Sequence, residues 1–251
     1  MARVTAVINQ KGGVGKSTTV HALCSGLKLK GYSTLTVDCD PQCNLSDTMQ
    51  ADTAGKGTHE ALNGTPITEL IQHTPHGDII PSSAELAGSD REFVDVGREY
   101  LLSIALEPIL NNYSHIILDC PPSLTILSVN ALCACTDALI PMTADMYSLQ
   151  GLSQLFTTIN KVRQFCRKDV HIAGLLMCRH NSRSILSRDF MEMLESKATE
   201  LGTSLFKTVI RESVSIREAQ AQRESIFAYA ADSRPAADYE SFIKEYLEQE
   251  T

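Results

Sequence analysis

A glycine-rich loop near the start of the chain limits the possible folds more than any other feature. Residues 10–18 read Gln-Lys-Gly-Gly-Val-Gly-Lys-Ser-Thr; they follow an apolar run at residues 4–8 and open an amphipathic stretch at residues 17–30. Glycines lack a Cβ, so backbone N–H groups can converge on an anion at the start of a helix. A strand, such a loop and a helix in this order predict an α/β fold with a phosphate-binding site.

Each residue type in the loop suits a task at a nucleotide. We expect Lys16 to reach the β- and γ-phosphates and the Ser17 hydroxyl to ligate Mg²⁺. The predicted nucleotide-binding loop comprises Lys11, Gly12, Gly13, Val14, Gly15, Lys16, Ser17 and Thr18. The strict pattern has a glycine where Gln10 stands, and Lys11 follows it. Because two lysines on the same phosphates would repel each other, Lys11 is better suited to a second nucleotide.

Apolar runs rich in Val and Ile alternate with amphipathic stretches along the chain. The predicted strands are residues 4–8, 34–37, 115–118, 138–141, 172–177 and 205–210, and the predicted helices are residues 17–30, 98–111, 125–133, 149–166, 187–201 and 236–249. This alternation predicts one domain over residues 1–251: a doubly wound, mostly parallel α/β sheet with helices on both faces. Residues 51–93, rich in Gly and Pro, are expected to form loops and short helices at the sheet edge.

Composition excludes several other classes of protein. With 43% hydrophobic and 21% charged residues in 251, the chain is not mainly disordered, and its apolar runs are too short to span a bilayer. The start of the chain lacks the pattern of a signal peptide, so we expect a cytoplasmic protein. Eight scattered cysteines predict buried free thiols rather than a metal site. No helix-turn-helix fits before Arg3, so any DNA contact would come from the main domain.

Charge is distributed unevenly. The net charge is -8, which repels nucleic acid and anionic membranes at long range. Residues 161–223 nevertheless hold twelve Lys/Arg against seven Asp/Glu, a local charge of +5. The rest of the chain carries -13, so a surface for a polyanionic partner is expected in this segment, and solvated helix faces are the alternative explanation.

Three motifs together resemble the ParA/MinD family of deviant-Walker ATPases. Beside the loop, residues 37–44 (Val-Asp-Cys-Asp-Pro-Gln-Cys-Asn) look like the family's first switch, and residues 116–123 (Ile-Ile-Leu-Asp-Cys-Pro-Pro-Ser) look like its second. Similarity continues at residues 148–152 and covers nearly the whole chain. The resemblance implies Mg-dependent hydrolysis of ATP to ADP and phosphate. It also implies an ATP-bound homodimer in which Lys11 contacts the nucleotide of the partner subunit.

Carboxylates at two predicted strand ends complete the expected site, because the carboxyl ends of parallel strands meet beside the phosphate loop. We expect Asp40 to orient the attacking water, and Ser17, Asp40 and Asp119 to hold Mg²⁺, Asp119 through the water shell of the ion. Asp38 is expected to hold the first switch by hydrogen bonds. By resemblance, Asn181 and Arg211 fall where family members enclose the adenine base.

Four members of the wider family compete. The nitrogenase iron protein needs cysteines in glycine-bearing loops, for which Cys120 is misplaced. MinD-like proteins end in a basic amphipathic helix, whereas residues 239–251 have one lysine and four glutamates, so we expect no membrane partner. Small-molecule ligases of related fold do not predict Lys11. ParA/Soj-type partitioning ATPases remain, and the match is close.

The ParA/Soj resemblance implies an ATP-bound dimer that holds DNA without sequence preference on the nucleoid, and a ParB-type protein that triggers hydrolysis. We expect the DNA surface in residues 161–223, with Arg183, Arg188, Arg211 and Arg217 as contacts. Two arginines of the family's matching stretch are replaced here, by Glu212 and Ser215. A nucleotide-gated spatial or assembly factor acting on a protein cargo is the alternative function.

Overall fold

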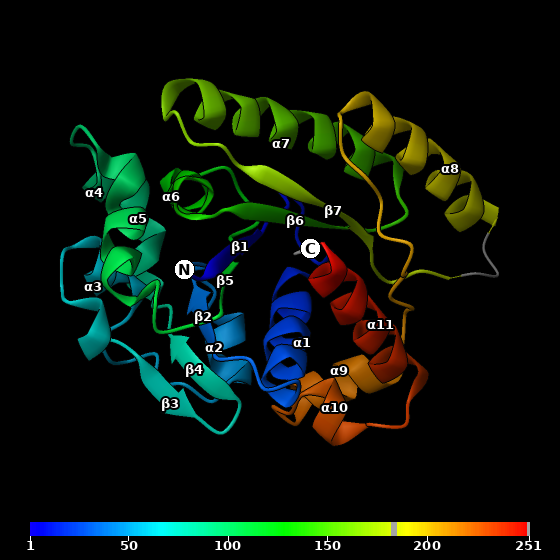
Figure 1. Cartoon of the computed structure of the whole chain (residues 1–251), viewed down its shortest axis with the longest axis horizontal. Helices are drawn as coiled ribbons and strands as arrows, with labels where there is room; N and C mark the ends of the chain where they lie inside the picture. The colour runs from blue at the N-terminus through cyan, green and yellow to red at the C-terminus, as the bar shows by residue number, and fades with distance from the viewer. Residues whose placement is uncertain (182–184, 250–251) are drawn as a thin grey trace.

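A seven-stranded sheet with helices on both faces forms the centre of the computed structural model, which describes residues 1–181 and 185–249 (Figure 1). The strand order is β3-β4-β2-β5-β1-β6-β7. The strands are β1 (Arg3–Val7), β2 (Thr34–Asp38), β3 (Gln72–Thr74), β4 (Gly77–Ile80), β5 (His115–Asp119), β6 (Asp137–Met142) and β7 (His171–Met177). All neighbours pair in parallel except the antiparallel edge pair β3 and β4. The predicted doubly wound fold is confirmed.

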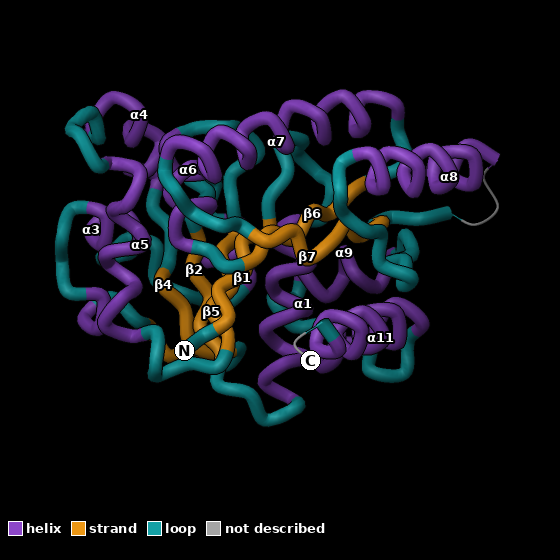
Figure 2. Tube along the Cα trace, turned by 45° about the horizontal axis from the view of Figure 1, so that its top comes forward, coloured by secondary structure: helices purple, strands orange, loops and turns teal. Residues whose placement is uncertain are grey.

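The helices form two layers (Figures 1 and 2). One face carries α1 (Lys16–Leu29), α2 (Asn44–Thr48), α9 (Val214–Ala221), α10 (Ile226–Tyr229) and α11 (Arg234–Glu248). The other carries α3 (Thr58–Leu62), α5 (Leu101–Leu106), α6 (Ile126–Ala134), α7 (Met146–Phe165) and α8 (Ile185–Glu200), with α4 (Ser89–Glu92) and the 3-10 turns η1 (Ile67–Glu69), η2 (Ala84–Gly88), η3 (Arg98–Tyr100) and η4 (Glu107–Ile109).

Successive residues of a strand pack into the hydrophobic cores on opposite faces of the sheet. Ile116 and Leu118 of β5 pack against the α5–α8 side, whereas Ile117 packs against α1 and α11. Strand side chains alternate between the faces of a sheet, and here both faces are covered by helices. This arrangement explains why the strands contain apolar runs rather than a polar alternation.

The strand predicted at residues 205–210 is wrong. This segment runs beside β7 but forms only an isolated bridge, between Leu175 and Leu205. Farther along, the backbone N–H groups of Lys207 and Thr208 donate to the two carboxylate oxygens of Glu245, at 2.7 and 3.0 Å. The N–H of Phe206 donates to Leu175 of β7, so the N–H of Thr208 is the next donor that a continuous parallel ladder would use, and Glu245 of α11 takes it.

Two other expectations need correction. The helix predicted over residues 98–111 is divided into η3, α5 and η4, and α5 ends just before Pro108, which lacks the N–H that a continuous helix needs. The irregular region at residues 51–93 contains the expected short helices, but it also forms β3 and β4. Strand β4 pairs in parallel with β2 and, with β3, extends the sheet at that edge. Helices α9 and α10 were not predicted.

The C-terminal helix α11 is part of the core. Its amphipathic pattern buries Tyr239, Phe242, Ile243 and Tyr246, and the helix lies against α1 (Figure 1). The apolar face is therefore used inside the domain. None of the described helices is long and apolar enough to cross a bilayer.

All eight cysteines are free thiols. Six are buried, and Cys43 and Cys166 are partly exposed. The prediction of free thiols is confirmed, with burial as its physical basis for six of them.

Candidate functional site

The glycine-rich loop joins β1 to α1 at the carboxyl edge of the sheet. Gly13 and Gly15 have φ of 73° and 94°, a left-handed conformation that favours glycine. Val14 between them is buried and anchors the loop. The Lys16 ammonium donates to the carbonyl of Lys11 at 2.9 Å, so its side chain curls back over the loop. Burial lowers the pKa of Lys16, and the charge of Asp119 opposes this.

Sheet register places the predicted carboxylates beside this loop. Asp119 at the end of β5 stands opposite Val7 of β1 on one side and Asp38 of β2 on the other. Asp40 follows two residues after Asp38. Asp119 and Asp40 therefore lie near Lys16, and Asp38 lies beside Asp119, as the parallel topology predicts.

Asp119 has the properties expected of a ligand for a cation. It is fully buried, and neither carboxylate oxygen has a hydrogen-bond partner among the described residues. Burial raises the pKa of Asp119 well above its usual range and Asp38 adds to this, whereas the nearby Ser17 hydroxyl and Lys16 lower it. Carboxylate and hydroxyl oxygens are ligands that Mg²⁺ prefers, so Asp119 and Ser17 fit a Mg²⁺ site or its water shell.

Asp38 holds the first switch, as expected. Its Oδ1 accepts from the N–H of Asp40 at 3.0 Å, and its Oδ2 accepts from the N–H and hydroxyl of Ser46 at 2.9 and 2.6 Å. Burial raises the pKa of Asp38 to about 6, although these hydrogen bonds lower it. The fully buried carboxylate thus fixes the backbone that leads from β2 into α2.

A cavity of about 440 Å³ extends from the loop to the first switch. It is lined by Gly12, Gly13, Gly15, Lys16, Ser17, Thr18, Asp40, Gln42, Asn44, Asp47, Thr48, Pro122 and Gln220. The structure therefore brings Lys16, Ser17 and Asp40 together around one space. The Asp40 Oδ1 accepts from the N–H of Gln42 at 3.0 Å, which leaves Oδ2 for a ligand or water.

Lys11 has a partner within its own chain. Its ammonium lies 2.6 Å from Oδ2 of Asp145, the residue that caps α7, and it is 41% exposed. Burial alone would raise the pKa of Asp145, but hydrogen bonds from Lys11, Ser148 and Thr143 lower it to about 2. Asp145 therefore stays ionised, and Lys11, paired with it, is not among the residues that line the cavity of the loop.

A second cavity, of about 260 Å³, adjoins the first through Gly13, Gly15, Thr18 and Gln220. Its wall includes Cys178, Ile210, Ile216 and Tyr239, so it is more apolar. Arg211, a predicted base-pocket residue, lines this cavity, and its guanidinium is paired to both oxygens of Asp238 at 2.6 Å. Asn181 is exposed and is not among the lining residues, so the structure gives no support for its predicted role.

Sequence reasoning missed several residues at these cavities. Gln220 of α9 donates to the Thr18 hydroxyl at 2.8 Å and lines both cavities. Arg179 adopts φ of 52°, pairs with Glu212 at 2.9 Å and donates to the carbonyl of Gly13. None of them belongs to a motif that spacing could reveal, because each reaches the loop through the tertiary fold.

The four arginines predicted to contact DNA differ in their surroundings in the structure. Arg183 lies outside the described residues, and the same holds for the side chain of Arg188. Arg211 is paired with Asp238, so its charge is largely neutralised. Arg217 of α9 is exposed, and no ion pair forms with it among the described residues. Arg217 also lines the second cavity, so it is the one predicted contact that the described structure leaves without an ion pair, at the edge of the expected base pocket.

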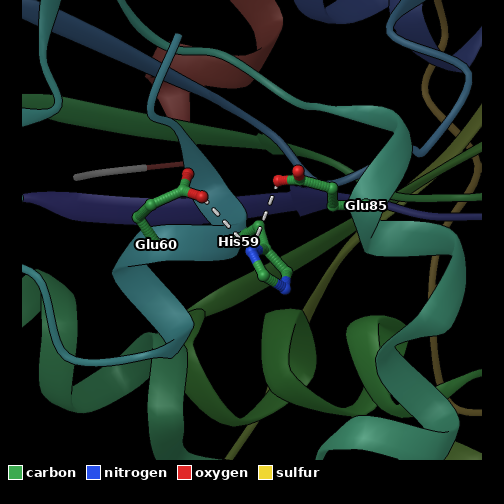
Figure 3. Close-up of side chains that lie close together, drawn as sticks. All are labelled: His59, Glu60 and Glu85. Carbon is green, nitrogen blue, oxygen red and sulfur yellow. Dashed lines mark hydrogen bonds and ion pairs between the residues drawn. The ribbon is translucent and has the colours of Figure 1, made fainter. Parts of the chain in front are cut away.

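A second group of titratable side chains lies in the helix layer that contains α3, η2 and α4. His59 stands between Glu60 and Glu85 (Figure 3), at 3.3 and 3.7 Å from its Nδ1. Its Nε2 lies 2.8 Å from Glu92, and Glu60 also accepts from the N–H of Gly57. These contacts tie α3 to η2 and α4, so the cluster is explained by packing and ion pairing.

This cluster predicts a pH-dependent contribution to stability. Burial would lower the pKa of His59, but Glu92 and Glu60 raise it above its usual 6.5. The contribution should be complete below pH 6.5 and lost as the pH rises through the raised value. Thermal melts at pH 6 and pH 8 should therefore differ less for His59→Gln than for the parent, by a few degrees at most. An unchanged difference would contradict this.

Comparisons with known proteins agree with this architecture. A family model described as an AAA domain matches residues 2–172. The chain is 35% identical to the sporulation initiation inhibitor protein Soj of Bacillus subtilis, over 98% of both chains. It is 33% identical to the chromosome partitioning protein ParA of Myxococcus xanthus, over 100% of this chain and 90% of that one.

Solved structures show the same fold. A Mycobacterium smegmatis protein described as a cobyrinic acid a,c-diamide synthase, with ADP and magnesium bound, superposes with a TM-score of 0.86. It is 30% identical and covers 99% of this chain and 95% of its own. McdA of Cyanothece, 20% identical over 98% and 100% of the two chains, has a TM-score of 0.88 and supports the fold alone.

The parallel sheet, the loop before α1 and the strand-end carboxylates define a P-loop ATPase. Within that class, sequence identities of 35% to Soj and 33% to ParA, over nearly the whole chain, show the family. The chain belongs to the ParA/Soj family of chromosome-partitioning ATPases.

Proposed function

We propose that the chain binds Mg-ATP across the two adjoining cavities. The observation that carries this proposal is the buried Asp119 carboxylate beside the phosphate loop, whose oxygens accept no hydrogen bond of standard geometry from the described residues although the Ser17 hydroxyl and the Lys16 charge lie near it. The phosphates fit the cavity of Lys16 and Ser17, and the adenine fits the apolar cavity of Ile210 and Tyr239. Mg²⁺, held by Ser17 and Asp119, would neutralise phosphate charge.

Hydrolysis in this proposal depends on positioning by the chain's own side chains. Lys16 would move from the Lys11 carbonyl onto the β- and γ-phosphates, where its positive charge stabilises the transition state. The second oxygen of Asp40 would orient a water toward the γ-phosphate. Asp40 would thus contribute to the chemical step more than to ground-state binding.

In the proposed ATP-bound dimer, Lys11 contacts the nucleotide of the partner subunit. For this, Lys11 must exchange Asp145 for a phosphate. The Lys11–Asp145 pair is partly exposed and contributes up to about 1 kcal/mol, whereas a charge-assisted hydrogen bond to phosphate contributes about 1.5–3 kcal/mol. The exchange is therefore favourable once a second nucleotide is within reach.

The cellular role proposed is partitioning of DNA. The ATP-bound dimer would bind DNA without sequence preference through α9 and its neighbours, associate with the nucleoid, and release DNA when a ParB-type protein stimulates hydrolysis. A monomer contributes few cations, but two copies held on one face act on the same duplex. The identities to Soj and ParA support this role.

Replacing Arg217 with Glu tests the DNA surface. We expect retention on non-specific duplex DNA with ATP to fall by about tenfold or more, because each dimer loses two cations near phosphate. Because Arg217 also lines the cavity proposed for adenine, ATP affinity is measured in parallel with a fluorescent analogue, and ATP-dependent dimerisation, measured by light scattering at saturating ATP, should not change. In the parent, affinity should fall steeply with salt, by about 0.9 log units per log unit of salt for each phosphate contacted.

Lys30→Glu provides a matched control, because Lys30 is exposed at the far end of α1 from the loop and its change of charge is the same. Equal losses in Arg217→Glu and Lys30→Glu would show that only net charge matters. Unchanged retention in Arg217→Glu would reject α9 as a DNA surface. ATP-dependent capture of a protein cargo without DNA retention would favour the alternative function.

A further inference from the structure

Four buried residues form a closed ring of hydrogen bonds around the first switch. Asp38 accepts from the N–H of Asp40 and from the hydroxyl of Ser46, at 3.0 and 2.6 Å. The Ser46 oxygen accepts from the N–H of Ser82 at 2.9 Å. The Ser82 hydroxyl then donates to the carbonyl of Asp40 at 2.6 Å, which closes the ring.

This ring fixes the backbone of Asp40 on both sides. Its N–H is held by Asp38 and its C=O by Ser82, and no member of the ring is more than 7% exposed. Hydrogen bonds in such a buried setting are strong, and losing one partner leaves a buried polar group unsatisfied. The direction of the Asp40 carboxylate therefore depends on groups that do not line the phosphate cavity themselves.

Ser82 lies in the segment that follows β4, within residues 51–93, which the sequence predicted to form only loops and short helices at the sheet edge. The same segment is anchored by Thr58, whose N–H donates to the carbonyl of Pro81 at 2.8 Å and whose hydroxyl donates to the carbonyl of Asp38 at 2.7 Å. Strand β4 thus carries Ser82 to a fixed place beside β2.

We infer that Ser82, acting with Ser46, is a positioning residue for hydrolysis that sets the aim of Asp40. The inference rests on the proposed role of Asp40 in orienting water. Misplacing a group that orients a reactant slows the chemical step, whereas ATP is held by the loop and Lys16. Ser82 should therefore affect kcat and not the affinity for ATP.

Ser82→Ala provides the test. We expect the single-turnover rate of ATP hydrolysis to fall about tenfold, with the affinity for a fluorescent ATP analogue unchanged within about twofold. Ser82→Thr, which keeps the hydroxyl, should recover most of the rate. Ser83→Ala is the matched control, because Ser83 is the next residue, is buried, and its hydroxyl has no partner among the described residues.

A double variant separates positioning from a general structural effect. If Ser82 acts through Asp40, then adding Ser82→Ala to Asp40→Ala should slow hydrolysis no further. Independent, multiplying losses would overturn the inference, and so would a full rate in Ser82→Ala or an equal loss in Ser83→Ala. A parent rate in Asp40→Ala would instead reject the proposed role of Asp40, which distinguishes the two failures.

Discussion

Asp40→Ala is expected to slow ATP hydrolysis by about 10²- to 10⁴-fold, the range for groups that handle the attacking nucleophile. Asp40 lines the cavity of the phosphate loop, and one of its oxygens is already engaged by the N–H of Gln42. The affinity for ATP should stay within about threefold of the parent, because a water-orienting carboxylate contributes mainly in the transition state. Quench-flow with radiolabelled ATP measures the rate, and a fluorescent analogue measures binding.

The variant should also accumulate as an ATP-bound dimer, since the step that ends the bound state is blocked. Glu69→Ala, an exposed carboxylate on η1, controls for the loss of one negative charge. Hydrolysis at the parent rate would remove Asp40 from the mechanism. Failure to bind ATP would show that it serves binding rather than the chemical step.

Lys11→Ala should abolish ATP-dependent dimerisation while leaving ATP binding by the monomer nearly intact. In a two-fold dimer both copies of Lys11 are lost, so the dimer loses about 3–6 kcal/mol, or about 10²- to 10⁴-fold in association. Breaking the pair with Asp145 returns only a small part of this. Light scattering with ATP across a concentration series measures the association.

Lys16→Ala gives the contrasting result. Lys16 is buried in the loop and should contact the phosphates of its own nucleotide, so its loss should weaken ATP binding itself. A dimer that forms undiminished in Lys11→Ala would disprove the role of Lys11 in trans. Equal losses of ATP affinity in both variants would show that both lysines serve the same nucleotide.

Much of this site could be predicted because its chemistry is local in sequence. The glycine loop, Asp40 and Asp119 lie at strand ends, and parallel pairing brings such ends together whatever the rest of the chain does. The same holds for the sheet, whose buried strands are continuous apolar runs. Hydrophobic pattern and loop chemistry were sufficient here.

The residues that sequence reasoning missed act through tertiary contacts. Ser82 is an unremarkable serine until β4 pairs with β2 and carries it to Asp40. Gln220 lies on α9, which was not predicted and which reaches Thr18 across the fold. Residues 205–210 have a strand-like composition, but Glu245 of α11 captures two of their N–H groups. The hydrophobic pattern of a short segment does not show that a distant side chain will accept hydrogen bonds from its backbone N–H groups.

An ATP-gated partitioning switch is tested by retention of the parent chain on non-specific duplex DNA with Mg-ATP, with Mg-ADP and without nucleotide. We predict retention that is strong with ATP, weak in the other two conditions, indifferent to DNA sequence and lost as salt increases. Equal retention in all three conditions, or none in any, would contradict an ATP-gated partitioning switch.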